Sequence, residues 1–114
     1  MQIFDRSKGP LPQGDITLIA VESSPTGDVI TAERGSIVVA HSETGHHHVV
    51  DARNARLERG ESPWICYLTV TAEYADLVHL REVNPHETVR LPTGKYKICR
   101  QREWTPEGWR AVAD

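Results

Sequence analysis

Residues 36–51 read SIVVAHSETGHHHVVD, and this stretch predicts a β-hairpin. Two short runs, residues 37–41 and 46–50, are rich in valine and isoleucine, whose branched side chains favour extended backbone. Between them, residues 42–45 form a four-residue connection of a common hairpin length, and its glycine permits a positive φ. We therefore expect two antiparallel strands joined by a short turn.

The turn fixes which residues of this hairpin face each other. Side chains alternate between the two faces of a strand, so one register assigns every position to a face. The predicted pairs are His41 with His46, Val39 with His48, and Ile37 with Val50. All six side chains then share one face with three imidazoles at its open end, whereas His47 points to the opposite face.

The rest of the chain repeats this pattern of short apolar runs between turn residues. Further runs cover residues 16–21, 64–70, 77–80, 89–91 and 96–104. Glycine and proline separate them, as at residues 92–94, where we expect the chain to turn. We predict one all-β domain over residues 1–114, a small antiparallel barrel or sandwich of about six to nine strands.

A helix is predicted only at the end of the chain. Thr105 can cap a helix, Pro106 suits the first helical position, and Glu107 complements the positive end of the helix dipole. We therefore expect a short C-terminal helix over residues 106–112.

The composition is that of an ordinary globular chain without a membrane segment. Of the 114 residues, 39% are hydrophobic and 25% are charged, which is typical of a folded domain. No stretch approaches the ~20 apolar residues of a transmembrane helix, and residues 1–12 lack the apolar core of a secretion signal. We therefore expect a cytoplasmic protein without a membrane partner.

The two cysteines, Cys66 and Cys99, are expected to be reduced thiols in that compartment. Cys66 alternates in phase with Leu68 and Val70, which predicts a small buried side chain rather than a nucleophile. The sequence thus predicts neither a disulfide framework nor a catalytic thiol.

Positive charge is concentrated near the C-terminus, although the whole chain has a formal charge of -3. Residues 90–110 contain six basic side chains and two acidic ones, so the remainder is acidic. Because mixed charges usually pair within a molecule, we expect Arg100 and Arg102 to meet acidic groups of this chain. The predicted partner is a small molecule or a protein, a second copy of the chain included, and not nucleic acid.

The histidines are the residues that indicate a site. His46 and His48 alternate on one strand and project two imidazoles the same way, while His41 lies across the hairpin. His79 and His86 flank a later turn and are further candidate ligands. Since imidazole nitrogens bind transition metals, we predict a Zn²⁺ or Fe²⁺ site formed by His46 and His48 with one or two of the other three.

Three interpretations of these histidines stay open: a metal site, solvated or structural side chains held by carbonyls and carboxylates, and acid–base catalysis without a metal. A metal with an open position would lower the pKa of a bound water toward ~7, and the protein would then be a metal-dependent hydrolase. The alternative function is a non-enzymatic accessory or interaction module of a phage or mobile element, with structural histidines.

Four motifs are the most distinctive parts of the chain. They are Gln13-Gly14-Asp15, Thr44-Gly45-His46-His47-His48-Val49, Leu91-Pro92-Thr93-Gly94-Lys95-Tyr96 and Arg100-Gln101-Arg102-Glu103-Trp104-Thr105-Pro106-Glu107. Together they resemble a family of small uncharacterised prokaryotic and prophage-borne proteins. The resemblance implies that His46, His48, His79 and His86 form the site, and it implies no particular activity.

Overall fold

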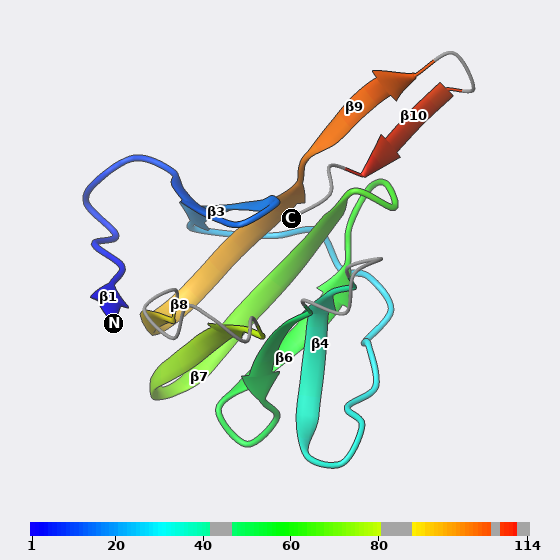
Figure 1. Cartoon of the computed structure of the whole chain (residues 1–114). Helices are drawn as coiled ribbons and strands as arrows, with labels where there is room; N and C mark the ends of the chain where they lie inside the picture. The colour runs from blue at the N-terminus through cyan, green and yellow to red at the C-terminus, as the bar shows by residue number, and fades with distance from the viewer. Residues whose placement is uncertain (42–46, 81–87, 106–107, 112–114) are drawn as a thin grey trace.

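The chain forms ten β-strands and no helix in the part that the computed structural model describes (Figure 1). That part comprises residues 1–41, 47–80, 88–105 and 108–111, with only the backbone described for residues 102–111. The strands are β1 (Gln2–Ile3), β2 (Leu11–Gln13), β3 (Ile16–Val21), β4 (Ser36–Ala40), β5 (His48–Asp51), β6 (Ala55–Arg59), β7 (Ile65–His79), β8 (Val89–Arg100), β9 (Arg102–Thr105) and β10 (Gly108–Ala111). The all-β prediction is confirmed, and none of the described residues belongs to a helix that could cross a bilayer.

Eight of the strands build a single sheet in the order β2-β3-β8-β7-β5-β4, with β6 also paired to β7 and β1 to β8. β1 and β8 run parallel, and all the other paired strands run antiparallel. Within the described strands, β2 and β4 stand at the two ends of this order and do not pair, so the sheet is not closed into a barrel. β4 is therefore an edge strand.

The two long central strands, β7 and β8, are both bent at the same place. Their pairing shifts register between Val70 and Tyr74, which marks a bulge. Because the shift exchanges the two faces of a strand, Val70 points into the core before the bend, and Ala75 and Leu77 point into it afterwards. Residues 92–94 lie inside β8 at this bend, so the prediction of a turn there is wrong.

Apolar side chains from most strands of the curled sheet form one core. The large apolar side chains that are almost completely buried are Ile16, Leu18, Val50, Leu57, Leu68, Val70, Leu77, Leu91, Tyr96 and Ile98. A buried side chain of this size contributes about 1.5–3 kcal/mol to stability through its removal from water. Tyr96 also makes two specific contacts, since its hydroxyl donates to the Pro92 carbonyl oxygen at 2.6 Å and the Phe4 ring packs edge-on at 5.2 Å.

The hairpin predicted for residues 36–51 is present as β4 and β5. Its paired residues are Ser36 with Asp51, Ile37 with Val50, Val38 with Val49, and Ala40 with His48. The pair of Ile37 with Val50 is as predicted, but the pairing nearer the loop is displaced by one residue.

A bulge between Val38 and Ala40 causes this displacement. His48 consequently lies opposite Ala40, and the prediction that it faces Val39 is wrong. The bulge lets Val39 and Ala40, although adjacent in the chain, both point into the core. The predicted pairing of His46 lies outside the described residues.

Residues 102–111 contain the hairpin β9–β10 and not the predicted helix. β10 pairs antiparallel with β9, and Trp109 lies directly opposite Trp104. Aromatic residues favour strands, and a helix of about two turns that includes Gly108 has little stability of its own. The prediction of a helix is therefore wrong for residues 108–111, and residues 106, 107 and 112 lie outside the described residues.

Arg6 connects the N-terminal segment to the bend of β8 through hydrogen bonds of its side chain. The guanidinium of Arg6 donates to the carbonyl oxygens of Lys95 at 3.0 Å and Val21 at 3.2 Å. It also lies 4.8 Å from the centre of the Tyr96 ring, which is a cation–π distance. Gly94 has a φ of 143°, and a Cβ on it would come within 2.5 Å of Arg6, so only glycine fits there.

Replacing Gly94 with alanine is expected to lower the free energy of unfolding by about 1–3 kcal/mol, because the new Cβ strains the backbone and displaces the Arg6 guanidinium. Gly9→Ala is the matched control, since a Cβ on Gly9 meets nothing within 4 Å, and it should be nearly neutral. Gly35→Ala, with a φ of 80° but open space, should fall between them. Urea unfolding of the three variants measures the series, and three equal losses would contradict this account.

Candidate functional site

Four polar side chains are buried among the described residues, and together they form a cluster around His48. They are Gln13, Asp15, His48 and His79, with exposed fractions of 4%, 2%, 0% and 3%. Gln13 ends β2 and Asp15 precedes β3, whereas His48 begins β5 and His79 ends β7. In the sheet, β8 and β7 separate β3 from β5, so these side chains meet because the sheet curls. We call these four residues the His48 cluster.

The imidazole of His48 is held at both ring nitrogens by oxygen atoms. Nδ1 lies 2.8 Å from Oε1 of Gln13, and Nε2 lies 2.8 Å from Oδ1 of Asp15. The amide nitrogen of Gln13 donates to the Leu77 carbonyl oxygen at 2.8 Å, which turns the amide oxygen toward His48. Two acceptors call for two N–H donors, which only the protonated imidazolium supplies. The geometry therefore favours an imidazolium paired with the carboxylate of Asp15.

His79 stacks on His48 from the neighbouring strand. The two residues are directly opposite in β5 and β7, and their ring centres lie 4.0 Å apart with an angle of 11° between the planes. Imidazole lone pairs lie in the ring plane, so parallel rings direct them side by side and not toward one point. The pair is not arranged as two ligands of one ion.

Arg100 connects the His48 cluster to the surface. Its Nε lies 3.8 Å from Oδ2 of Asp15, and one of its NH₂ groups donates to the carbonyl oxygen of His41. The predicted meeting of Arg100 with an acidic group of the same chain is therefore confirmed. The side chain of Arg102 lies outside the described residues.

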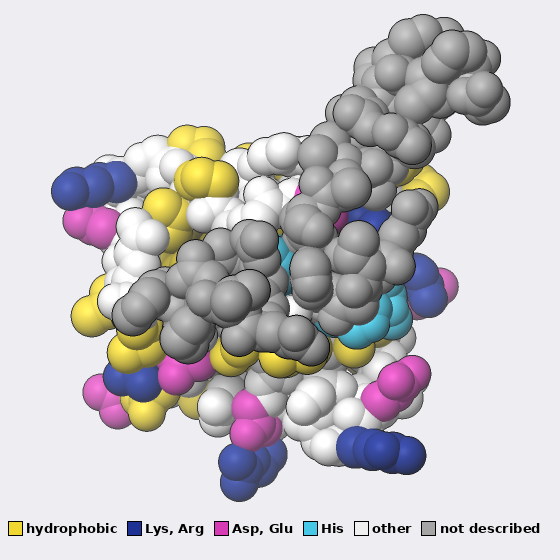
Figure 2. Space-filling model, viewed as in Figure 1, with side chains coloured by type: hydrophobic (Ala, Val, Ile, Leu, Met, Phe, Trp, Pro, Cys, Tyr) yellow, Lys and Arg dark blue, Asp and Glu magenta, His cyan; other side chains and the backbone are white. Residues whose placement is uncertain are grey.

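Other arginines also have acidic partners in the same chain. Arg90 lies 2.8 Å from Asp76, across β7 and β8, and Arg53 lies 2.7 Å from Asp51. On the face drawn in Figure 2, basic side chains are scattered and mostly lie beside acidic ones. Nucleic acid binding depends on a continuous basic surface, and this face does not provide one in the part that is described.

The structure does not bring His41 into the His48 cluster. His41 is exposed, and its ring lies edge-on to the ring of His47, with 5.1 Å between their centres. His47 was predicted to point away from the site, and it is the histidine that His41 contacts. The bulge in β4 explains part of the difference between the predicted and the observed position of His41, because it changes the alignment of β4 with β5 just before this residue.

The predicted metal site spans residues inside and outside the described part. His46 and His86 lie outside it, so a shell that includes them stays a prediction. Among the described residues, no group of three His, Cys, Asp or Glu side chains is placed to hold a metal ion. His48, the central predicted ligand, has both ring nitrogens directed at protein oxygens.

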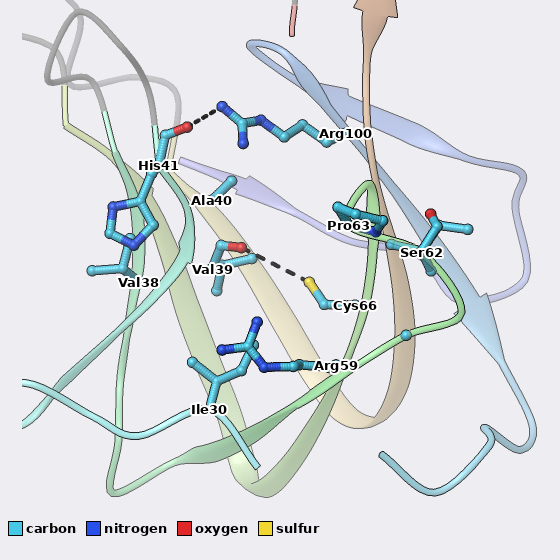
Figure 3. Close-up of a pocket in the computed structure, with 12 residues that line it drawn as sticks. Ile30, Val38, Val39, Ala40, His41, Arg59, Ser62, Pro63, Cys66 and Arg100 are labelled. Atoms are coloured by element: carbon cyan, nitrogen blue, oxygen red, sulfur yellow. Dashed lines mark hydrogen bonds between the residues drawn. The ribbon is translucent and has the colours of Figure 1, made fainter. Parts of the chain in front are cut away.

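A groove of about 600 Å³ opens next to Arg100, between β4 and the connection from β6 to β7 (Figure 3). Its lining residues are Ile30, Val38, Val39, Ala40, His41, Arg59, Gly60, Ser62, Pro63, Ile65, Cys66 and Arg100. This volume is within the range of small-molecule sites in proteins, roughly 300–1,000 Å³. The groove lies where the edge strand β4 has no further strand beside it.

Cys66 lies on the floor of this groove. Its thiol donates to the carbonyl oxygen of Val39, with 3.8 Å between sulfur and oxygen. Burial, with a smaller contribution from the neighbouring Cys99, raises the pKa of the Cys66 thiol to about 12. A thiol that remains protonated is a poor nucleophile, which fits the prediction that Cys66 is structural.

Three residues of the cluster and the groove were not predicted: Gln13, Asp15 and Arg59. Gln13 and Asp15 flank a glycine and alternate ahead of an apolar run, so a polar pair on one face could have been inferred from the sequence. Arg59 gives no such signal. Its place in the groove depends on how β6 lies relative to β4, which local sequence does not encode.

Comparison with known proteins identifies the family of this chain. A family model described as a domain of unknown function, DUF8820, matches residues 12–101, which is most of the chain. The match includes the whole His48 cluster and ends before the β9–β10 hairpin. No curated protein and no solved structure matches the chain. The resemblance to an uncharacterised family agrees with this match.

Replacing His48 with phenylalanine is expected to lower the free energy of unfolding by about 3–5 kcal/mol, because it leaves the Asp15 carboxylate and the Gln13 amide oxygen buried without their donor. Asp15→Asn, which keeps an acceptor but removes the charge, should cost less. His41→Ala is the control, since His41 is exposed and offers Arg100 only its backbone, and it should change stability by less than about 0.5 kcal/mol. Equal losses for His48→Phe and His41→Ala in denaturant unfolding would contradict the assigned role of His48.

Alkylation tests the environment of Cys66. In a Cys99→Ser variant, iodoacetamide at mildly alkaline pH should modify native Cys66 roughly tenfold or more slowly than the denatured chain, because a pKa of about 12 leaves little thiolate. The rate in the native protein should rise as the pH is raised further. Mass spectrometry of timed samples measures both rates, and equal rates for native and denatured protein would show that the thiol is accessible and ordinary.

Proposed function

We propose that this chain, which belongs to the DUF8820 family of domains of unknown function, is a non-enzymatic binding module with structural histidines. In this proposal the His48 cluster holds the sheet in its curled form, and the groove beside Arg100 receives the partner. In this proposal His48 stabilises the fold, and it affects binding only by holding the strands that line the groove.

One observation carries the proposal: both ring nitrogens of His48 lie 2.8 Å from protein oxygens, in a side chain with no exposed surface. A general base needs a free nitrogen near its substrate, and a metal ligand needs a nitrogen lone pair. A fully buried imidazole that donates from both nitrogens supplies neither. Its chemistry is that of a hydrogen-bonded structural cation.

The groove supports the binding half of the proposal. It is open, its volume suits a small ligand, and Arg100 places one of its walls in direct contact with the His48 cluster. Interaction sites commonly combine apolar walls with a few placed polar groups, and this groove has that composition. A partner bound there would contact residues from β4, β6, β7 and β8 at once.

The competing proposal is the metal site, in which His46 and His48 with His41, His79 or His86 hold Zn²⁺ or Fe²⁺, and a metal-bound water makes the protein a hydrolase. That site requires His48 to exchange its bond to Gln13 or Asp15 for a bond to the ion. The two proposals therefore differ in the protonation of one imidazole. A phage or mobile-element origin stays a prediction from the sequence motifs.

Nitrogen NMR of histidine-labelled, untagged protein distinguishes the two functions. We expect both ring nitrogens of His48 to carry protons that exchange slowly with water, and we expect their signals to stay unchanged when equimolar Zn²⁺ is added. His41→Ala is the control for zinc bound loosely at the exposed His41 and the half-buried His47. Loss of one His48 ring proton on zinc addition, in the wild type and in the control alike, would establish the metal site and overturn the proposal.

A further inference from the structure

The groove follows the edge of β4 and not one of its faces. Four consecutive residues line it, Val38 to Ala40 at the bulge of β4 and His41 directly after the strand. The carbonyl oxygens of Val39 and His41 are directed into it, and Figure 3 shows them turned toward Cys66 and Arg100. These two donors already occupy carbonyls that an incoming β-strand would need. The edge is therefore poorly suited to adding a peptide strand.

Among the described residues that line the groove, the charged side chains are Arg59 and Arg100, and none is acidic. Arg100 already contacts Asp15 and the His41 carbonyl. The guanidinium of Arg59, in contrast, makes no ion pair with any described residue, although Glu33 borders an adjoining hollow that Arg59 also lines. Among the described residues, Arg59 therefore has no carboxylate within ion-pair distance, and its guanidinium donors are available to a ligand.

The rest of the lining is largely apolar. In Figure 3, Ile30 lies beside the Arg59 guanidinium, Ala40 lies between the two arginines, and Val38 lies below the His41 ring. Arg59 is itself exposed, so its guanidinium is open to a ligand while apolar side chains line the groove next to it. An accessible arginine beside apolar walls favours an anion that carries an apolar body, because each part of such a ligand then finds its complement.

We infer that the groove binds a small molecule with an apolar body and a carboxylate head, and that Arg59 holds the carboxylate. The inference rests on the proposed function, since it assumes that the groove is the binding surface. Arg59 supplies two parallel N–H donors to the carboxylate, and Ile30, Val38 and Ile65 cover the apolar body. Arg100, which is held by Asp15 and the His41 carbonyl oxygen, provides a second positive charge at the other end of the groove.

Three probes of one chain length test the ligand class on the full chain: octanoate, octanol and octylammonium. Amide NMR spectra report binding at residues 38–41 and 59–66. Octanoate should shift these amides at the lowest concentration, and Arg59→Gln should weaken octanoate binding about tenfold through loss of one charged hydrogen-bonded contact. Arg53→Gln is the matched control, since it also removes one positive charge, and its side chain is 86% exposed and paired with Asp51. It should leave octanoate binding unchanged.

Each other outcome overturns a defined part of the argument. If octanol binds the same amides as tightly as octanoate and Arg59→Gln has no effect, the carboxylate assignment is wrong while the groove remains a binding surface. If Arg53→Gln weakens binding as much as Arg59→Gln, net charge and not Arg59 selects the ligand, which again refutes the assignment. If none of the probes shifts the groove amides in folded protein, the proposed binding surface fails as well. Thermal unfolding of both variants checks that each is folded.

Discussion

The hydrogen bonds of His48 to Gln13 and Asp15 are the interaction on which the rest of this structure depends. Residues of β2 and of the turn before β3 belong to one side of the sheet order, and His48 belongs to β5 near the other. Two central strands separate them, so the bonds cross the interior and hold the curled sheet across its concave side. The backbone does not close this sheet, and these side chains supply part of the connection that closure would have made.

Buried charged networks are expensive to desolvate, and well-packed apolar residues often match their stability. The advantage of the hydrogen-bonded network here is that its bonds require one geometry. Apolar side chains would fill the same space in many relative positions of β2 and β5, whereas His48 accepts only one arrangement of two oxygen partners. The stacked His79 and the bond from Gln13 to the Leu77 carbonyl extend that constraint to β7. The cluster therefore defines how far the sheet curls, and the open side of the sheet is the place where the groove forms.

Local sequence predicted the parts of this fold that local chemistry controls. The alternation of β-branched and polar residues gave the strands, and the hairpin of β4 and β5 follows from it, including the pair of Ile37 with Val50. Local sequence did not predict the bulges. The bulge at Val38–Ala40 and the bend near residues 92–94 arise where the curled sheet must keep apolar side chains inside. Of the histidines predicted to form the site, His48 and His79 meet, His41 does not join them, and His46 and His86 lie outside the described residues. The partners of His48, Gln13 and Asp15, come from a segment 33 or more residues earlier, a separation that periodicity cannot bridge.

The relation between the cluster and the groove follows from the position of Arg100. Its guanidinium lies near Asp15 on one side and donates to the His41 carbonyl on the other, so it joins the buried network to the edge strand. If His48 carries a proton, Asp15 is shared between two cations, and the positive charge of Arg100 is only partly neutralised. An anion in the groove then meets a basic end as well as Arg59. On the proposed binding mode, His48 contributes to the electrostatic potential of the groove through Asp15 and Arg100, so a buried side chain affects ligand binding without touching the ligand.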